Sequence, residues 1–227
     1  MKINRFSDMC KWGFLVSILI FTGCAAPNLY SVNMYYDETQ AKIPEYLKAD
    51  KASNAIISIA EFTDTREMDD RLVIGRVVEK DGMKTLVFPK NIKATKAVSN
   101  GIKEYLRKAG YKVPNKIEQW DLKEQNIPQG IANILIGGNI DELEITCRRG
   151  FPTNTYTTNM RLTIIFADMA KGKILYKKEV GNNYSKEHVL FSEEVLGAQI
   201  GIALGDAIEK LFEDKAVAQK LKEVIAQ

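Results

Sequence analysis

The sequence predicts a layered α+β sandwich with a mainly antiparallel sheet, two main helices on one face and a short C-terminal helix. Three patterns indicate this fold. An Asp81-Gly82 turn separates two β-rich runs, apolar and polar residues alternate over 155–166, and apolar stripes recur at helical spacing over 92–109 and 192–214. An apolar share of 45% in 227 residues is sufficient for one core and excludes a largely disordered chain.

The first 23 residues have the pattern of a secretory signal peptide. Basic residues precede an apolar run over 12–22, which is too short to span a bilayer as a helix. The run ends in Phe21-Thr22-Gly23-Cys24, which resembles the lipobox of bacterial lipoproteins. The resemblance implies cleavage between Gly23 and Cys24 and attachment of a diacylglycerol and an acyl lipid, such as palmitate, to Cys24. Two alternatives stay open: an ordinary cleaved signal with a coincidental cysteine, and an uncleaved anchor.

This interpretation sets the expected location and the cysteine chemistry. Much of the formal charge of +3 lies in the signal, so we expect no nucleic-acid surface. In lipoproteins of bacteria with two membranes, an aspartate after the cysteine favours the inner membrane. Ala25 stands at that position, which implies the periplasmic face of the outer membrane. Cys10 would leave with the signal and Cys24 would carry the lipid, so Cys147 would be the one free thiol.

We divide the chain into a signal peptide (1–23), a lipidated cysteine with a tether (24–52) and a single α+β domain (53–227). The tether mixes proline, tyrosine and polar residues without lasting periodicity, although residues 29–36 could add an edge strand. The domain is expected to open with an almost wholly apolar strand over 55–60, which is typical of a strand covered on both faces.

A hairpin and a helix follow this strand. A β-hairpin over 72–88 is expected because both residues of its Asp-Gly turn tolerate positive φ. An apolar stripe over 92–109 predicts a helix, which Gly110 would end. Residues 111–130 contain two prolines and predict a surface excursion, with Trp120 packed back on the body.

The next part of the sequence predicts a meander of three strands. A strand over 131–147 changes the phase of its alternation near Gly137-Gly138, which indicates a β-bulge. The alternating run over 155–166 is the cleanest strand pattern in the chain, and a turn over 168–172 leads to a partner strand. The inner residues of that partner strand are expected to be Ile174, Tyr176 and Val180.

A helix over 192–214 begins at a suitable N-cap, Ser192, and precedes an amphipathic tail over 216–225. Its unusual feature is a strip of glycines along one face, because residues four apart lie nearly above one another on a helix. Each glycine costs about 1 kcal/mol relative to alanine, so a close contact is expected to offset it. That contact is either with the chain's own sheet or with a helix of another copy or of a partner. The strip consists of Gly197, Gly201 and Gly205.

Several short motifs occur in a characteristic order along the chain. They are the lipobox, Asp64-Thr65-Arg66 after the first strand, Lys-Ala-Gly-Tyr-Lys-Val over 108–113 at a helix end, Gly172-Lys173 between two strands, and an alanine-rich C-terminal helix. On these motifs the chain resembles the YajG-like family of bacterial lipoproteins. The resemblance implies a fold and a location in the cell envelope. It implies no catalytic residue beyond the lipid-bearing Cys24.

Few residues are candidates for metal or nucleophile chemistry. The mature chain would hold one histidine, His188, and one free cysteine, Cys147, whereas zinc takes three or four protein ligands. We therefore expect no metal and no cofactor other than the covalent lipid. A Cys147–His188 dyad is an alternative, but Cys147 lies on the apolar side of a strand pattern. The acidic loop over 64–70 could offer oxygen ligands to calcium, although Arg66 and Arg71 would compensate its charge.

Two groups of charged residues are candidates for a contact loop. Asp64 and Arg66 lie in the polar loop after the first strand. Arg148 and Arg149 precede a stretch rich in threonine and tyrosine, where they could meet anionic lipid head groups or peptidoglycan. Simple solvation of both groups is the alternative.

These observations favour a non-enzymatic role. We expect an outer-membrane-anchored periplasmic lipoprotein that acts as a structural or interaction component of the envelope, with an envelope protein or a second copy as partner. One alternative is a subunit of an oligomeric export or envelope-assembly machine, of which the glycine strip would be the signature. Another is a binder of a small ligand or a glycan.

Overall fold

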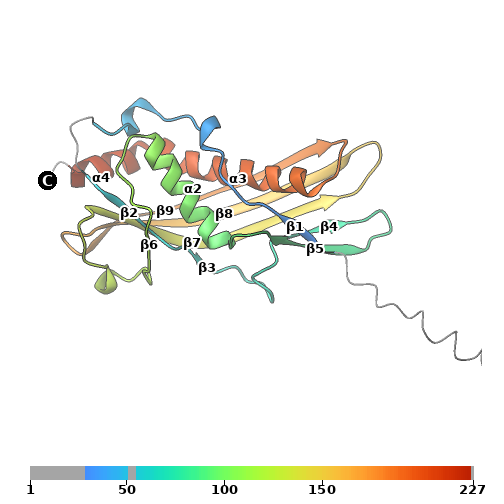
Figure 1. Ribbon diagram of the computed structural model, residues 1–227, viewed down its shortest axis with the longest axis horizontal. Coiled ribbons are helices and arrows are strands. Elements are labelled where there is room, and N and C mark those ends of the chain that lie inside the picture. Colours follow the sequence, from blue (N-terminus) through green and yellow to red (C-terminus); the bar gives the residue numbers. More distant parts are fainter. Residues whose placement is uncertain (1–28, 51–54, 226–227) are drawn as a thin grey trace, which may run out of the picture.

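The computed structural model describes residues 29–50 and 55–225. A large sheet forms one layer, and α2, α3 and α4 form a second layer on one of its faces (Figure 1). This arrangement confirms the predicted α+β fold with a mainly antiparallel sheet. No helix within the described residues is long and apolar enough to cross a membrane. The helices and strands are β1 Tyr30–Val32, η2 Glu38–Gln40, η3 Glu45–Leu47, β2 Ile57–Ala60, β3 Thr63–Asp64, β4 Gly75–Val78, β5 Lys84–Pro89, α2 Ala94–Lys108, β6 Ile117–Glu118, η4 Glu124–Asn126, β7 Ile134–Arg148, β8 Asn154–Asp168, β9 Lys173–His188, α3 Glu193–Glu213 and α4 Lys215–Ile225.

The meander of β7, β8 and β9 is the longest part of the sheet. Each strand has 15 or 16 residues, and both pairings are antiparallel. The alternation predicted for β8 is confirmed, because its six inward side chains are buried beneath the helices. These residues are Tyr156, Thr158, Met160, Leu162, Ile164 and Phe166.

The β-bulge of β7 lies later than we expected. The pairing with β8 shifts between Ile140 and Glu142, so the extra residue is Asp141 and not one of the two glycines. The Asp141 carboxylate accepts hydrogen bonds from the hydroxyls of Thr65 (3.0 Å) and Thr163 (2.6 Å), which hold the bulge. Gly137 and Gly138 serve close packing instead. A Cβ atom on Gly138 would lie 2.1 Å from the carbonyl oxygen of Thr163.

A second irregularity corrects one residue of β9. The register between β8 and β9 shifts between Phe166 and Ala167, so Ile174 pairs with Ala167 while Tyr176 pairs with Phe166. Ile174 therefore packs on the reverse face of the sheet and not on the inner face. Tyr176 and Val180 lie on the inner face, as predicted.

The other strands use β7 as their common partner. β2, β3 and β4 pair with successive parts of one edge of β7, all in parallel, while β8 occupies the other edge. The predicted hairpin is confirmed by β4 and β5, which pair antiparallel around Gly82 with its positive φ of 87°. These parallel pairs were not predicted from the sequence.

The helices lie where their patterns predicted them. Gly110, with φ of 95°, ends the helical region of α2, and the N–H of Tyr111 bonds back to the carbonyl of Leu106. The Ser192 side chain accepts from the N–H of Val195 and caps α3. Tyr105 of α2 stacks on Phe212 of α3 with ring centroids 4.9 Å apart, which ties the two helices together.

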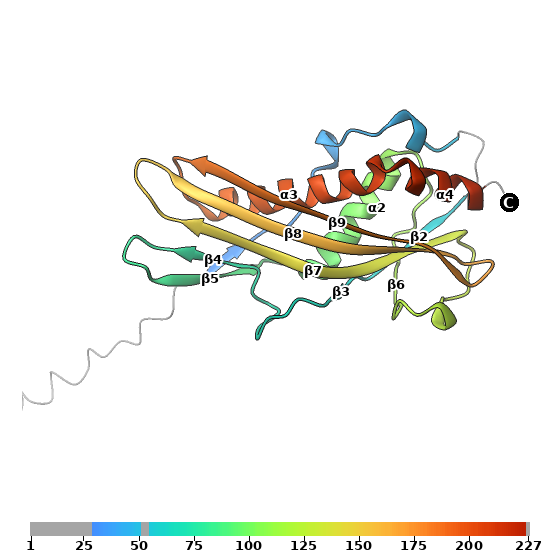
Figure 2. The ribbon, with the colours of Figure 1, turned by 180° about the vertical axis from the view of Figure 1, so that it is seen from behind.

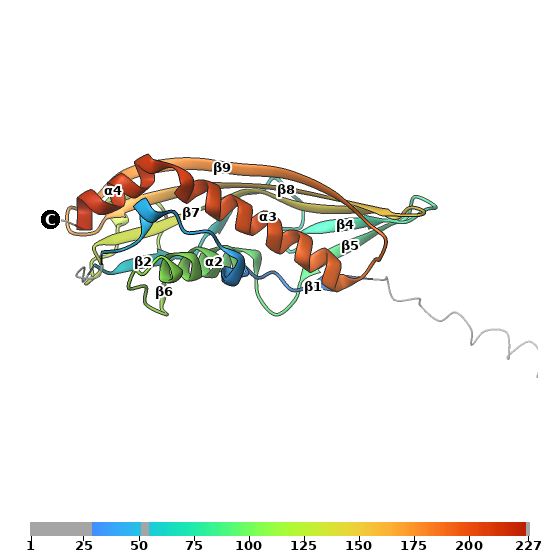
Figure 3. The same ribbon diagram turned by 90° about the horizontal axis from the view of Figure 1, so that it is seen from above.

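The described part of the expected tether lies against the domain. β1 pairs in parallel with β5 at the sheet edge, and the chain then runs along α3 toward α4 (Figure 3). From 32 to 36 every second side chain is buried, which makes this stretch a structural part of the core. The buried residues of the segment are Val32, Met34, Tyr36, Ala41 and Leu47.

The excursion over 111–130 covers the reverse face of the sheet at the end opposite β4 and β5 (Figure 2). Trp120 packs there on Leu135 and Ile165 and donates its indole N–H to the carbonyl of Lys123 (2.9 Å). The predicted return of Trp120 to the body is confirmed, and this side of the sheet has a small core of its own.

Candidate functional site

The glycine strip of α3 seats the chain's own N-terminal segment. A Cβ atom on Gly197 would lie 2.8 Å from the carbonyl oxygen of Asn33, and one on Gly201 would lie 2.8 Å from that of Tyr35. Both contacts are with backbone, so a larger residue at either position has to displace the segment. The close contact that we expected is therefore neither with the sheet nor with another helix.

A groove runs beside this seat, between the N-terminal segment and α3. Its volume is about 260 Å³, and Gly201 and Gly205 form part of its floor. The exposed apolar side chains of Tyr35 and Ile202 stand along it. An apolar groove with exposed walls is typical of a surface that receives a side chain of another molecule.

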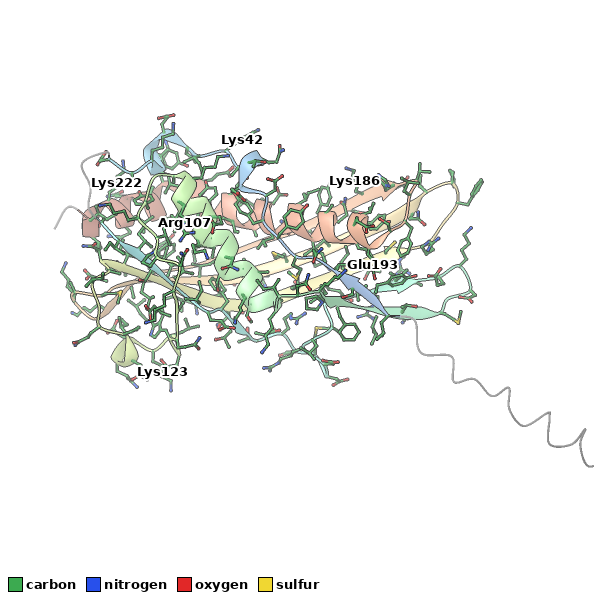
Figure 4. The ribbon with its side chains drawn as sticks, in the orientation of Figure 1. Lys42, Arg107, Lys123, Lys186, Glu193 and Lys222 are labelled. Carbon is green, nitrogen blue, oxygen red and sulfur yellow. The ribbon has the colours of Figure 1, made fainter. Side chains whose placement is uncertain are left out.

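The groove is acidic. Asp37, Asp206 and Glu209 line it, and among its lining residues there is no lysine or arginine. Burial raises the pKa of Glu209, and the charges of Asp206 and Glu213 raise it further, whereas the backbone N–H and the charge of nearby Lys42 lower it. Figure 4 marks Lys42 on the segment that runs along α3. A cationic group entering the groove would relieve this repulsion.

One residue that lines the groove, Tyr36, has a hydroxyl without a hydrogen-bond partner among the described residues. This hydroxyl is buried. Burial is also the main cause that raises its pKa. A buried hydroxyl without a partner costs free energy, so a donor or acceptor that reached it would gain affinity.

The structure does not bring the four charged candidates into one contact loop. Arg66 is 2% exposed, and its guanidinium bonds to Asp64 and to the carbonyls of Val73 and Leu143, so it cannot meet a partner. Its role is to hold the polar loop on the sheet. β3 pairs with β7 at Asn139–Ile140, so Asp64 lies eight strand residues from Arg148, or about 26 Å.

Arg148 and Arg149 lie at the far end of β7. Arg149 lies over the ring of Phe191, with 4.1 Å between the guanidinium carbon and the ring centroid, and donates to the Asn154 side chain (3.1 Å). Arg148 is exposed. Arg149 therefore joins the β7–β8 turn to the segment before α3, and Arg148 is free to meet solvent or an anion.

A second hollow, of about 520 Å³, lies between the polar loop and the open face of the sheet. Its cations are largely compensated from within. Arg76 lies 2.5 Å from Glu144, and Arg161 lies 3.9 Å from both Glu142 and Glu179. We regard this charged hollow as a solvated surface.

The alternative of a Cys147–His188 dyad gains no support, because no hydrogen bond joins the two side chains within the described residues. Cys147 is buried on the inner face of β7, whereas His188 ends β9 and its Nδ1 lies 3.1 Å from the carbonyl oxygen of Leu190. Burial raises the pKa of the Cys147 thiol to about 11. Within the residues that the structure describes, no group of three or more His, Cys, Asp or Glu side chains could hold a metal ion. Gly23 and Cys24 lie outside these residues.

Sequence reasoning missed the N-terminal half of the groove. Tyr35 and Asp37 were assigned to a tether, with an edge strand over 29–36 as an alternative. The sequence did contain a pattern that indicates a packed segment. Val32, Met34 and Tyr36 alternate with polar or exposed residues, the pattern of an extended segment with one buried face.

Comparisons with known proteins place the chain by fold. Neither the protein-family models nor the curated proteins contain a match to it. A crystal structure of a DUF330-family protein from Xanthomonas campestris superposes with a TM-score of 0.52 at 9% identity, over 86% of this chain and 98% of that one. The two proteins share a fold.

Two further solved structures are more distant. An uncharacterized protein gives a TM-score of 0.49 at 8% identity, over 82% of this chain and 99% of that one. A lipoprotein from Neisseria meningitidis gives 0.28 at 11% identity, over 70% and 99%. These superpositions are too loose to bear on function.

Proposed function

We propose that this protein is a lipid-anchored envelope protein that acts by binding another protein through the acidic groove along α3. The observation that carries the proposal is the seating of residues 33–36 on the glycine strip. Residues 32–36, which begin eight positions after Cys24 in the sequence, are part of the domain core and form one side of the groove.

The lipid anchor is the sequence-based half of the proposal. The lipobox ending in Cys24 and the absence of aspartate at Ala25 support the periplasmic face of the outer membrane in a bacterium with two membranes. The motif order supports a relation to the YajG-like lipoproteins. Fold-level similarity adds only that the domain architecture occurs in another bacterial protein.

The nature of the groove supports protein binding over catalysis or small-ligand binding. Its walls are apolar, its charges are carboxylates, and its volume of about 260 Å³ lies below the roughly 300–1,000 Å³ of typical small-ligand sites. A protein that presents an apolar side chain beside a lysine or arginine would complement it. Binding of a small ligand or glycan is the weaker alternative.

A role as a subunit of an oligomeric export machine loses its main support. The glycine strip was the feature that favoured self-association, and the chain's own segment packs on Gly197 and Gly201, which leaves only Gly205 and part of Gly201 on the floor of the groove. We therefore retain binding of a different protein as the proposal.

In-cell photo-crosslinking tests it. A photoreactive residue at Ile202, in the groove, should give one discrete adduct, which Asp206→Lys weakens by reversing the groove charge and Cys24→Ala abolishes. The control is Ile131, an isoleucine outside the groove that is 86% exposed against 40% for Ile202, so its greater accessibility makes the absence of this adduct there a stringent result. Equal labelling at both positions, or none at Ile202 in a membrane-bound chain, would contradict the proposal.

A further inference from the structure

Exposed apolar side chains gather at one end of the domain. Met83, Phe151, Val189 and Leu190 are between 65% and 90% exposed, and each lies in or next to a loop or turn. At the opposite end the one large apolar side chain exposed among the described residues is Ile131. We call the first four residues the apolar tip.

The strand register places the tip residues together. Val78 pairs with Arg148, so the β4–β5 turn with Met83 and the β7–β8 turn with Phe151 leave the sheet at the same level. Asn154 pairs with His188, which brings Val189 and Leu190 to that level as well. Figure 1 shows these three connections side by side at the end of the sheet away from the C-terminus.

The chain also enters the domain from this end. Tyr30 pairs with Val87 in parallel, and β5 begins next to the β4–β5 turn, so Leu29 comes from the direction of the tip. Leu29 lies level with Thr146 of β7, and Phe151 follows Thr146 by five residues, at most about 17 Å. Five residue steps also separate Cys24 from Leu29 and span at most about 18 Å.

Basic side chains surround the apolar tip. The segments 79–84, 148–153 and 184–190 carry five lysines and arginines against three carboxylates. Each of these carboxylates has a partner within the domain. Glu79 lies 3.9 Å from Arg149, Asp81 accepts from the N–H of Met83, and Glu187 accepts from the Thr153 hydroxyl. The remaining charge suits the anionic head groups of a lipid surface.

We propose that the apolar tip inserts into the interface of the bilayer that holds the Cys24 lipid, so that the domain stands on this end. The proposal rests on the lipid anchor of the proposed function and adds a second, non-covalent contact. The several acyl chains implied for Cys24 are enough to hold the chain at the bilayer, and apolar side chains beside basic ones would add a contact that fixes how the domain lies on it. The lipid on Cys24 would keep the domain close to the bilayer, and the apolar tip would set the orientation of the domain on it.

Tryptophan fluorescence in proteoliposomes tests the insertion. The full chain, isolated from membranes, carries Phe151→Trp in one sample and Ile131→Trp in the other, and the unsubstituted chain gives the background of its own tryptophans. Vesicles of phosphatidylethanolamine and phosphatidylglycerol contain phospholipids brominated near the head-group end of the acyl chains, which quench a tryptophan only when its side chain reaches the depth of the brominated carbons. We expect the signal from position 151 to shift to the blue and to be quenched, and the signal from 131 to remain unchanged. Mass spectrometry of the N-terminal peptide reports lipidation of Cys24 in the same samples.

The outcomes separate the two proposals. A lipidated chain with position 151 unquenched, or with 131 quenched equally, overturns tip insertion and leaves the anchor. An unlipidated chain whose position 151 is quenched supports insertion and refutes the anchor. An unlipidated chain without quenching overturns both. Leu190→Trp repeats the measurement at a second tip position, so a local effect at 151 cannot decide the result.

Discussion

The guanidinium of Arg66 meets the carboxylate of Asp64 at two points, with Nε 2.9 Å from Oδ1 and Nη2 2.7 Å from Oδ2. The same guanidinium donates to three backbone carbonyls. A two-residue strand, β3, is thereby joined both to the loop before β4 and to the centre of β7. Asp64 and Arg66, which the sequence suggested as a surface contact, form an internal ion pair that holds the polar loop on the sheet.

Arg66→Ala should therefore destabilise the domain strongly. The substitution leaves the Asp64 carboxylate and several buried carbonyls without their donor, and removing one partner of a buried ion pair costs about 3–5 kcal/mol. Chemical denaturation measures the change in the free energy of unfolding. Arg71→Ala is the matched control, because the Arg71 side chain is exposed and about 0.5 kcal/mol or less is expected. Equal effects of the two substitutions would refute the assigned role.

The glycines of α3 should respond in opposite directions to alanine. Gly201→Ala places a Cβ 2.8 Å from the carbonyl oxygen of Tyr35, so it should destabilise by about 1–3 kcal/mol through overpacking. Gly205→Ala places a Cβ 3.5 Å from the Tyr36 ring, an ordinary contact, and should stabilise by up to about 1 kcal/mol through helix propensity. Thermal and denaturant unfolding measure both. Stabilisation by Gly201→Ala would mean that the backbone of Tyr35 can move away from α3 at little cost.

The stability of the domain should fall in alkali. Burial raises the pKa of Cys147 from 9.0 to about 11 and that of Tyr111 from 10.0 to about 12. Above the ordinary pKa of each group, the unfolded chain releases a proton that the folded chain retains. The free energy of unfolding therefore decreases as the pH rises toward the raised pKa of the folded chain. The slope is at most about 1.4 kcal/mol per pH unit for each group.

Cys147→Ala isolates the thiol contribution. The variant should show a shallower slope between pH 9 and 10 than the parent chain, because the tyrosines whose pKa burial raises still contribute there. A set of denaturation curves across this range measures it. An unchanged slope would assign the alkaline loss to other groups.

Trp120→Ala should destabilise the reverse face of the sheet. Trp120 covers Leu135 and Ile165, and loss of a buried tryptophan costs about 3–5 kcal/mol. The expected local signature is faster amide hydrogen exchange in 111–130 than in α3. An equal increase of the exchange rate in all parts of the domain would show instead that residues 111–130 unfold only together with the rest of the domain.

The parts of the fold that could be predicted from the sequence are specified by residues close together in the chain. Alternation in β8, the turn at Gly82 and the cap at Ser192 each depend on residues only a few positions apart. The parallel pairing of β2, β3 and β4 with β7 joins residues about 70 positions apart, and no short pattern specifies which edge of β7 they take.

The candidate site was harder to predict for the same reason. Gly197 and Gly201 predicted a close contact, but the sequence of α3 does not indicate that Asn33 and Tyr35 make it. Arg66 was misjudged because a charged residue in a polar loop is usually exposed, and its burial depends on Leu143 and Val73 supplying acceptors. The bulge was misplaced because Asp141 is held by two hydroxyls from distant parts of the sequence, one in the polar loop after β3 and one in β8.

The seat of the N-terminal segment also sets the order in which the chain matures. The N–H of Ser31 bonds to Glu193, 162 positions further along, and Tyr35 lies on Gly201. During synthesis from the N-terminus, residues 31–36 have no seat until α3 has emerged. Residues 31–36 can therefore take their place in the core only after almost the whole chain has been made.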